Sequence, residues 1–176
     1  MKDAFDVLGL PPAFDLDTKT LEQRYRDLQR ALHPDKFAQA SASERLRSLS
    51  HAVSVNDAYR ALRDELRRAE ILFVRLGGEV SERGGQPADA ALLMEVMELR
   101  EQLSETKAHG DHKARERLTK EVRALNQRST DELRQAFVAL ETGELSALDT
   151  AARALSRLRY YRRFLDEVAV LEDTAD

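Results

Sequence analysis

The middle of this chain, at residues 77–87, holds two glycine pairs and a proline within eleven residues. Helical sequence patterns lie on both sides of this segment. Glycine raises the entropic cost of ordering a helix, and proline ends one. We therefore predict two separate folding units, residues 1–76 and 88–176, joined by a linker at 77–87.

The composition favours helices and excludes several kinds of site. Of the 176 residues, 42% are hydrophobic and 34% are charged, with 7 Gly, 4 Pro and no Trp. Ala, Leu, Arg and Glu dominate, and all four are good helix formers. We therefore expect an all-α fold. The chain has no cysteine, which excludes disulfides, thiolate nucleophiles and cysteine-based zinc sites.

Charge and hydrophobicity also limit the partners that we expect. The formal net charge is -4, which argues against a nucleic-acid partner. No apolar run approaches the roughly 18 residues of a membrane helix, and residues 1–5 lack the apolar core of a signal peptide. We expect a cytoplasmic monomer with no membrane partner.

Apolar spacing predicts a four-helix N-terminal unit and a three-helix C-terminal unit. The pattern of the third helix consists of Leu46, Leu49, Val53, Asn56, Tyr59 and Leu62. Short connections make the last three helices antiparallel neighbours, so we expect a three-helix bundle. The predicted helices cover about residues 3–9, 18–32, 41–62 and 66–76, then 88–108, 112–142 and 145–172.

The residues between the second and third helices carry the strongest functional motif, His33-Pro34-Asp35-Lys36. At an exposed turn, the Asp35 carboxylate could accept a charge-assisted hydrogen bond from an arginine of a partner. The helix before the turn is basic and could steer an acidic partner surface into place. Its candidate binding residues are Arg24, Arg26 and Arg30. The alternative is an ordinary solvated turn beside a salt-bridged helix face.

The context of the motif resembles the J-domain family over about residues 3–75. The residues that carry the resemblance are Phe5-Asp6-Val7-Leu8-Gly9-Leu10, Tyr25-Arg26-x-Leu28, the His33 motif and Val55-Asn56-Asp57-Ala58-Tyr59-Arg60-x-Leu62. The resemblance implies that the His33–Lys36 motif and the basic helix dock on a DnaK-type chaperone and promote its ATP hydrolysis. This chain would then be an activator and not itself an enzyme.

The rest of the chain is similar to the HscB (Jac-type) branch of that family. It has no Gly/Phe-rich segment and no Cys-rich repeats, and its C-terminal unit begins Ala91-Leu92-Leu93-Met94-Glu95-Val96-Met97. The resemblance implies an HscA-like chaperone partner and an IscU-like iron–sulfur scaffold bound by the C-terminal unit. Some members carry a metal-binding cysteine tetrad, which this chain lacks, so we expect no metal and no cofactor.

The helix predicted at 88–108 has two apolar arcs. One stripe, at Leu92, Val96, Leu99 and Leu103, should pack into the bundle. At about 100° per residue, other residues fall off that stripe, and the resemblance implies that they hold the scaffold together with Tyr160 from the last helix. The alternative is that Leu93 and Met97 are core. The predicted scaffold-binding residues on this helix are Leu93, Met94, Met97, Glu98, Glu101 and Glu105.

Two competing functions stay open at this point. One is a general J-domain co-chaperone that delivers unfolded polypeptides, and the other is a structural or regulatory helical protein whose J-like half is inert. An enzyme has no support, because no catalytic constellation is evident. His109 and His112 flank a predicted turn without a third His or Cys nearby, so we expect a polar turn there and not a metal site.

Overall fold

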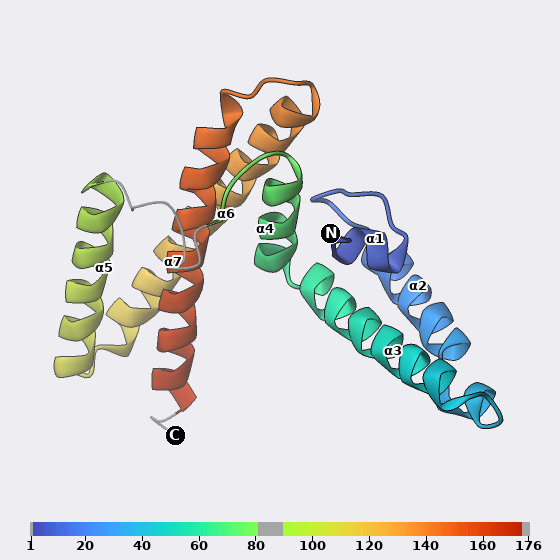
Figure 1. Ribbon diagram of the computed structural model, residues 1–176. Coiled ribbons are helices and arrows are strands. Elements are labelled where there is room, and N and C mark those ends of the chain that lie inside the picture. Colours follow the sequence, from blue (N-terminus) through green and yellow to red (C-terminus); the bar gives the residue numbers. More distant parts are fainter. Residues whose placement is uncertain (1, 81–89, 174–176) are drawn as a thin grey trace. The chain divides into compact units, whose positions relative to one another are not determined.

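The computed structural model describes residues 2–80 and 90–173, and it forms two compact units, residues 1–75 and 76–176 (Figure 1). These are called the first and second unit below. The described residues contain helices and no strand, which confirms the all-α prediction. Residues 81–87 of the predicted linker lie outside the described residues. The elements are α1 (Ala4–Leu8), α2 (Thr18–Ala31), the 3-10 helix η1 (Pro34–Phe37), α3 (Ala42–Arg63), α4 (Glu65–Arg75), α5 (Ala90–Ala108), α6 (His112–Glu141) and α7 (Ala147–Asp173).

Side-chain caps fix where the helices of the first unit begin. The Asp17 carboxylate accepts hydrogen bonds from the first backbone N–H groups of α2. Ser41 and Glu44 form a reciprocal capping box at the start of α3, and Asp3 and Asp6 form another at α1. Such caps satisfy N–H groups that have no partner inside the helix. The predicted helix starts near residues 17 and 41 are therefore confirmed.

Helices α2 and α3 form a hairpin that polar and aromatic contacts hold together. The Tyr25 and Tyr59 rings stack with centroids 4.0 Å apart. The Tyr25 hydroxyl also donates to Oδ1 of Asn56 at 2.9 Å. Nearer the turn, the Ser48 hydroxyl donates to the Leu32 carbonyl at 3.3 Å. These bonds fix the register of the hairpin and thereby the position of the turn that joins its helices.

A buried arginine organises the other end of the first unit. Arg68 of α4 is 9% exposed, and burial lowers its pKa. Its Nε donates to the Phe14 carbonyl at 2.8 Å and its Nη1 to the Leu62 carbonyl at 2.6 Å. The guanidinium carbon also lies 5.7 Å from the centre of the Phe14 ring. Arg68 therefore ties the segment before α2 to the junction of α3 and α4.

The first half of α3 presents a face that the sequence pattern does not predict. Leu46, Leu49 and Val53 are 68%, 60% and 52% exposed. The apolar spacing predicts the helix correctly, but only the second half of the pattern faces the core: Asn56 and Tyr59 are partly buried and Leu62 is fully buried. Helices α1 and α2 pack against α3 on an arc that leaves the first half of the pattern exposed. The residues buried on that arc are Ser48, Val55, Ala58 and Leu62.

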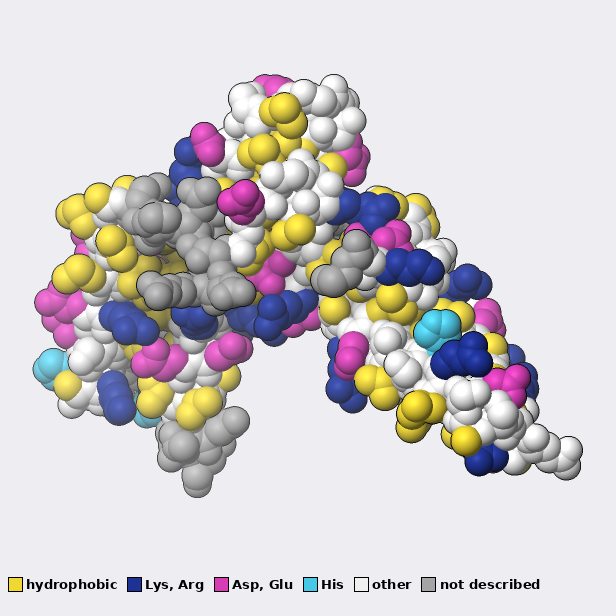
Figure 2. All heavy atoms as spheres, viewed as in Figure 1, with side chains coloured by type: hydrophobic (Ala, Val, Ile, Leu, Met, Phe, Trp, Pro, Cys, Tyr) yellow, Lys and Arg dark blue, Asp and Glu magenta, His cyan; other side chains and the backbone are white. Residues whose placement is uncertain are grey.

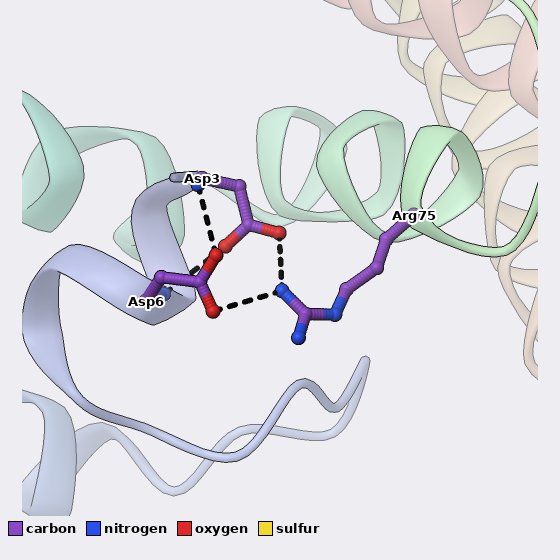
Figure 3. Close-up of polar contacts among 3 residues, drawn as sticks. All are labelled: Asp3, Asp6 and Arg75. Atoms are coloured by element: carbon purple, nitrogen blue, oxygen red, sulfur yellow. Dashed lines mark hydrogen bonds and ion pairs between the residues drawn. The ribbon is translucent and has the colours of Figure 1, made fainter. Parts of the chain in front are cut away.

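Arg75, at the end of α4, contacts two aspartates at the start of the first unit (Figure 3). Its Nη1 donates to Oδ2 of Asp3 at 2.6 Å and to Oδ1 of Asp6 at 3.1 Å. The Asp3 backbone N–H, and then Arg75, lower the pKa of Asp6. The two carboxylates raise the pKa of Arg75. The last helix of the unit is thus joined to the capping box of the first.

The second unit is a three-helix bundle, as predicted. One hydrophobic cluster contains side chains from all three helices. The Tyr161 hydroxyl adds a polar link, since it donates to the Glu95 carboxylate at 2.5 Å and so joins α7 to α5. Within the described ranges, no helix combines the length and hydrophobicity needed to cross a membrane. The buried cluster consists of Leu99, Leu103, Leu118, Val122, Tyr161, Phe164 and Val168.

Candidate functional site

The turn between α2 and α3, called the His33 turn below (residues 33–37), is a short 3-10 helix capped by His33. Nδ1 of His33 accepts a hydrogen bond from the Asp35 backbone N–H at 3.3 Å. The Lys36 N–H donates to the His33 carbonyl at 3.0 Å. Pro34 fits the first helical position because it has no N–H to satisfy. This turn has its own internal hydrogen bonds.

The Asp35 carboxylate points away from the protein. Its side chain is 89% exposed, and Nδ1 of His33 lies 3.4 Å from Oδ2 of Asp35. Lys36 beside it is also exposed. A carboxylate on an ordered turn, with its oxygens in solvent, can accept two hydrogen bonds from one arginine of a partner.

The arginines predicted to bind the chaperone fall into two groups. Arg26 and Arg30 are 66% and 71% exposed and pair with carboxylates of their own helix at 3.5 Å and 2.9 Å. Such surface pairs are worth little, so both guanidinium groups can exchange to a partner. Arg24 differs, because its Nε donates to the Leu8 carbonyl at 2.7 Å. The structure thus gives Arg24 a bond within the unit that the sequence did not reveal.

A depression of about 520 Å³ lies beside the His33 turn, between α2 and α3. Arg26, Arg30 and His33 contribute to one side of it, and Val55 and Asn56 of α3 to the other. The structure therefore brings two of the three predicted arginines together with the motif on one concave surface. Its lining includes both charged and apolar side chains.

The two arcs of α5 differ in exposure, although Val96 of the predicted core stripe is only partly buried. Leu92, Leu99 and Leu103 are buried in the bundle, at 5%, 4% and 4% exposure. Leu93, Met94 and Met97 are 52%, 63% and 71% exposed. The alternative that Leu93 and Met97 belong to the core is therefore wrong.

Carboxylates border these exposed hydrophobic residues. Glu98, Glu101 and Glu105 are all exposed. Figure 2 shows hydrophobic side chains gathered over the first half of α5, with acidic side chains next to them. A solvent-exposed apolar patch with a polar rim is typical of a protein-binding surface. We call Leu93, Met94, Met97, Glu98, Glu101 and Glu105 the outer face of α5.

The three aromatic residues of α7 have different surroundings. Tyr161 and Phe164 are both 2% exposed and belong to the core. Tyr160 is only partly buried, and its hydroxyl donates to the Val96 carbonyl of α5 at 3.1 Å. Burial raises the pKa of Tyr160. Of the three, Tyr160 is therefore the one that a partner bound beside α5 could reach.

The two histidines of the polar turn between α5 and α6 make local contacts. Nδ1 of His109 lies 2.9 Å from the Glu105 carbonyl, and His112 contacts Arg115. A depression of about 500 Å³ lies beside this turn. In the part of the chain that the structure describes, no group of three His, Cys, Asp or Glu side chains could hold a metal ion.

Comparison with known proteins assigns a family to both units. A model of the DnaJ domain matches residues 3–71, and a model described as the HSCB C-terminal oligomerisation domain matches residues 88–169. The chain is 36% identical over 181 residues to the "Co-chaperone protein HscB homolog" of Shewanella frigidimarina (strain NCIMB 400), with 96% of each chain covered.

Solved structures agree with the sequence relatives. The structure is similar to chaperone HscB from Vibrio cholerae, with a TM-score of 0.81 and 34% identity, covering 99% of this chain and 100% of that one. It is also similar to the human co-chaperone HscB, with a TM-score of 0.83 and 31% identity, covering 98% of this chain and 83% of that one. The resemblance inferred from the motifs is confirmed: the chain belongs to the HscB family of J-domain co-chaperones.

Proposed function

We propose that this chain is an adaptor with two binding surfaces. The His33 turn and the basic side of α2 bind a DnaK-type, HscA-like chaperone and stimulate its ATPase. The outer face of α5, with Tyr160, binds an IscU-like scaffold protein during iron–sulfur cluster assembly. The observation that carries the proposal is the 89% exposed Asp35 side chain on an ordered turn of a DnaJ-type unit.

The chaperone surface works through charge. Asp35 offers an acceptor whose orientation is fixed by the turn, and Arg26 and Arg30 line the depression beside it. An acidic chaperone surface would approach the arginines first, since charges act over about 8 Å at physiological salt. The Asp35 carboxylate would then accept from a chaperone arginine, which sets the register of the complex.

The scaffold surface works through hydrophobic contact with a charged border. Leu93, Met94 and Met97 offer side chains that a partner can bury, and methionine adapts to irregular surfaces. Each such side chain contributes roughly 1.5–3 kcal/mol when fully buried. The three glutamates select a partner whose apolar patch is bordered by basic groups.

The presence of both surfaces on one chain explains how an activator can be selective. A scaffold held by the second unit is tethered to a chaperone held by the first, so the second encounter is no longer bimolecular. Tethering by a short connection raises the effective concentration to about the millimolar range. The ATP is hydrolysed by the chaperone, and this chain supplies binding energy and orientation.

The chaperone surface is tested by Asp35→Ala. In single-turnover ATPase assays with the HscA-like chaperone of the same cell, we expect stimulation to fall at least about tenfold, since a charge-assisted hydrogen bond contributes roughly 1.5–3 kcal/mol. The matched control is Asp57→Ala, which removes another exposed carboxylate of the first unit. Unchanged stimulation by Asp35→Ala would falsify the proposal.

The scaffold surface is tested by calorimetric titration with the IscU-like scaffold of the same cell, with and without its cluster. We expect 1:1 binding that Leu93→Ser/Met97→Ser abolishes without loss of helicity. The matched control, Val138→Ser/Leu145→Ser, changes two side chains of the same unit that are 58% and 68% exposed. Sedimentation of the same samples checks the predicted monomer.

The titration also separates the competing functions. A folded wild-type protein that does not bind the scaffold, yet still stimulates the chaperone, would be a general J-domain co-chaperone for unfolded polypeptides. A folded protein that stimulates no chaperone would support a structural or regulatory role with an inert J-like half.

A further inference from the structure

One residue supplies the hydrogen-bond acceptors for the first backbone N–H groups of the His33 turn. Pro34 has no N–H, so the first two donors of η1 are those of Asp35 and Lys36. The Lys36 N–H donates to the His33 carbonyl at 3.0 Å, and the Asp35 N–H donates to the His33 ring at 3.3 Å. His33 therefore supplies the acceptors for both, one from its backbone and one from its side chain.

The N-cap hydrogen bond requires one form of the His33 ring. Nδ1 lies 3.3 Å from the Asp35 nitrogen and 3.4 Å from Oδ2 of Asp35. An unprotonated Nδ1 accepts from the N–H, whereas a protonated Nδ1 would donate to the carboxylate. One nitrogen cannot do both. The N-cap geometry corresponds to the neutral ring with its proton on Nε2.

The two forms have different consequences for a partner. In the capped form, the Asp35 N–H is satisfied and the carboxylate keeps both oxygens for solvent or for a chaperone arginine. In the other form, the ring would hold one carboxylate oxygen and leave the N–H without its acceptor. The capped form therefore presents the binding group in its free state.

We infer that His33 is a positioning residue, whose neutral Nδ1 caps the Asp35 N–H and thereby holds the Asp35 carboxylate outward for the chaperone. This inference rests on the proposed function for its consequence, but not for the cap itself. It assigns the essential contact of His33 to its own turn and not to the partner.

The two amide replacements of histidine distinguish these roles. In His33→Asn, Oδ1 lies as many bonds from Cα as Nδ1 does, and asparagine is among the best N-cap residues. In His33→Gln, the amide nitrogen reaches the distance of Nε2 and can donate there, but the proximal acceptor is lost. The asparagine variant therefore keeps an acceptor for the Asp35 N–H, whereas the glutamine variant keeps only a donor at the distance of Nε2.

The experiment compares both variants in two measurements. In chaperone ATPase assays at limiting co-chaperone, we expect His33→Asn to stay within about twofold of wild type and His33→Gln to lose about fivefold or more, since N-cap loss shifts such equilibria roughly 2- to 30-fold. In the free protein, NMR-detected exchange of the Asp35 amide should be slow in wild type and His33→Asn and several-fold faster in His33→Gln.

Each result has a defined meaning. Equal Asp35 exchange in wild type and His33→Gln would overturn the inference, as would stronger stimulation by His33→Gln than by His33→Asn. If the wild-type protein stimulates no chaperone, the proposed function fails, while the exchange measurement still tests the cap. Circular dichroism confirms folding, which should persist because the turn is exposed.

Discussion

The His33 turn and the outer face of α5 are both exposed, but they offer a partner different chemistry. The turn presents an exposed carboxylate on an ordered backbone, next to arginines that are held only by weak surface pairs. The outer face presents three hydrophobic side chains with a border of carboxylates. A partner of the turn must place a hydrogen-bond donor at the Asp35 carboxylate, and a partner of the outer face must have a surface complementary to its apolar side chains.

This difference determines how each surface fails. A hydrogen bond to a fixed carboxylate is lost when a few atoms are removed, so single substitutions at the turn should have large effects. Hydrophobic contact is shared among neighbouring side chains, so single substitutions on the face should weaken binding in part. The predictions below test this contrast and the packing that maintains it, from the largest expected effect to the smallest.

The largest difference in unfolding free energy is expected between substitutions on the two arcs of α5. Leu99→Ala empties a buried position in the core cluster and should cost about 2–5 kcal/mol of unfolding free energy. Met97→Ala, two residues earlier and 71% exposed, should stay within about 0.5 kcal/mol. Urea denaturation followed by circular dichroism measures both. A large loss for Met97→Ala would mean that the outer face is packed in solution.

The two surfaces should also respond differently to salt. Raising NaCl from about 50 to 500 mM shortens the Debye length to roughly 4 Å, so ATPase stimulation at limiting co-chaperone should fall several-fold. Scaffold affinity should change less, because burial of Leu93, Met94 and Met97 is not screened. Parallel ATPase and calorimetric titrations compare the two. An equal salt dependence would show that the glutamate border, and not the hydrophobic residues, carries scaffold binding.

The two units should lose stability at opposite ends of the pH scale. Hydrogen bonds from hydroxyl groups, and then from backbone N–H groups, lower the pKa of Asp17 and Glu44 below their ordinary 3.8 and 4.5. A lowered folded-state pKa stabilises above the unfolded-state value, and this stability is lost as pH falls through the folded-state value. The first unit should therefore weaken below about pH 4.

In the second unit, stability is expected to fall as the pH rises. Burial, and then the hydrogen bond to Glu95, raise the pKa of Tyr161 well above its ordinary 10.0. The folded state then keeps a proton that the unfolded state loses, so stability falls as pH rises above 10. NMR signals of each unit, followed during acid and alkaline titration, measure both effects. Parallel loss of the two sets of signals at either end would contradict this prediction.

The smallest effect is expected on the exposed side of α3. Leu46→Ser/Leu49→Ser should change the unfolding free energy by no more than about 0.5 kcal/mol per residue. The control Leu62→Ala removes a fully buried side chain of the same helix and should cost about 2–5 kcal/mol. Thermal and urea unfolding measure both. A cost near that of Leu62→Ala would mean that the residues 46 and 49 are covered.

Local features of the sequence were enough to predict the helices. Asp17 and Ser41 begin helices through side-chain bonds within a few residues, and Gly143 follows the end of α6 with a positive φ of 92°. The all-α fold and the three-helix bundle follow from this local information. On α5, the wheel separated two arcs but left open whether Leu93 and Met97 belonged to the core, and only the resemblance to the HscB branch favoured an exposed arc.

Contacts between distant residues were beyond the reach of sequence spacing. On α3, either apolar arc could have faced the hairpin, and only the packing of α1 and α2 selects one. The sequence placed Arg24 on a partner-binding surface and gave no sign of the bonds that Arg24, Arg68 and Arg75 make within the first unit. Each donates to at least one group far away in the sequence: Arg24 to the Leu8 carbonyl, Arg68 to the Phe14 carbonyl, and Arg75 to the Asp3 and Asp6 carboxylates.

The cap on Asp35 was missed for another reason. The His33 motif was recognised as a partner-binding sequence, so its histidine was assigned to the partner. The His33 ring nitrogen accepts from the Asp35 N–H, only two residues later in the sequence. The histidine–proline pair before a short helix could have suggested this N-cap. Asp, Asn, Ser and Thr are the usual N-cap residues, and histidine in that position is easily overlooked.

The bonds from Arg75 to Asp3 and Asp6 have a consequence for the modular use of residues 1–75. They hold the first and last helices of this unit together, so the chain enters and leaves it at neighbouring points. Units with adjacent ends can be grafted onto other chains, or inserted into their loops, without distortion of the host. The same property would let an engineer transplant this DnaJ-type unit onto another protein without disturbing the fold of either partner.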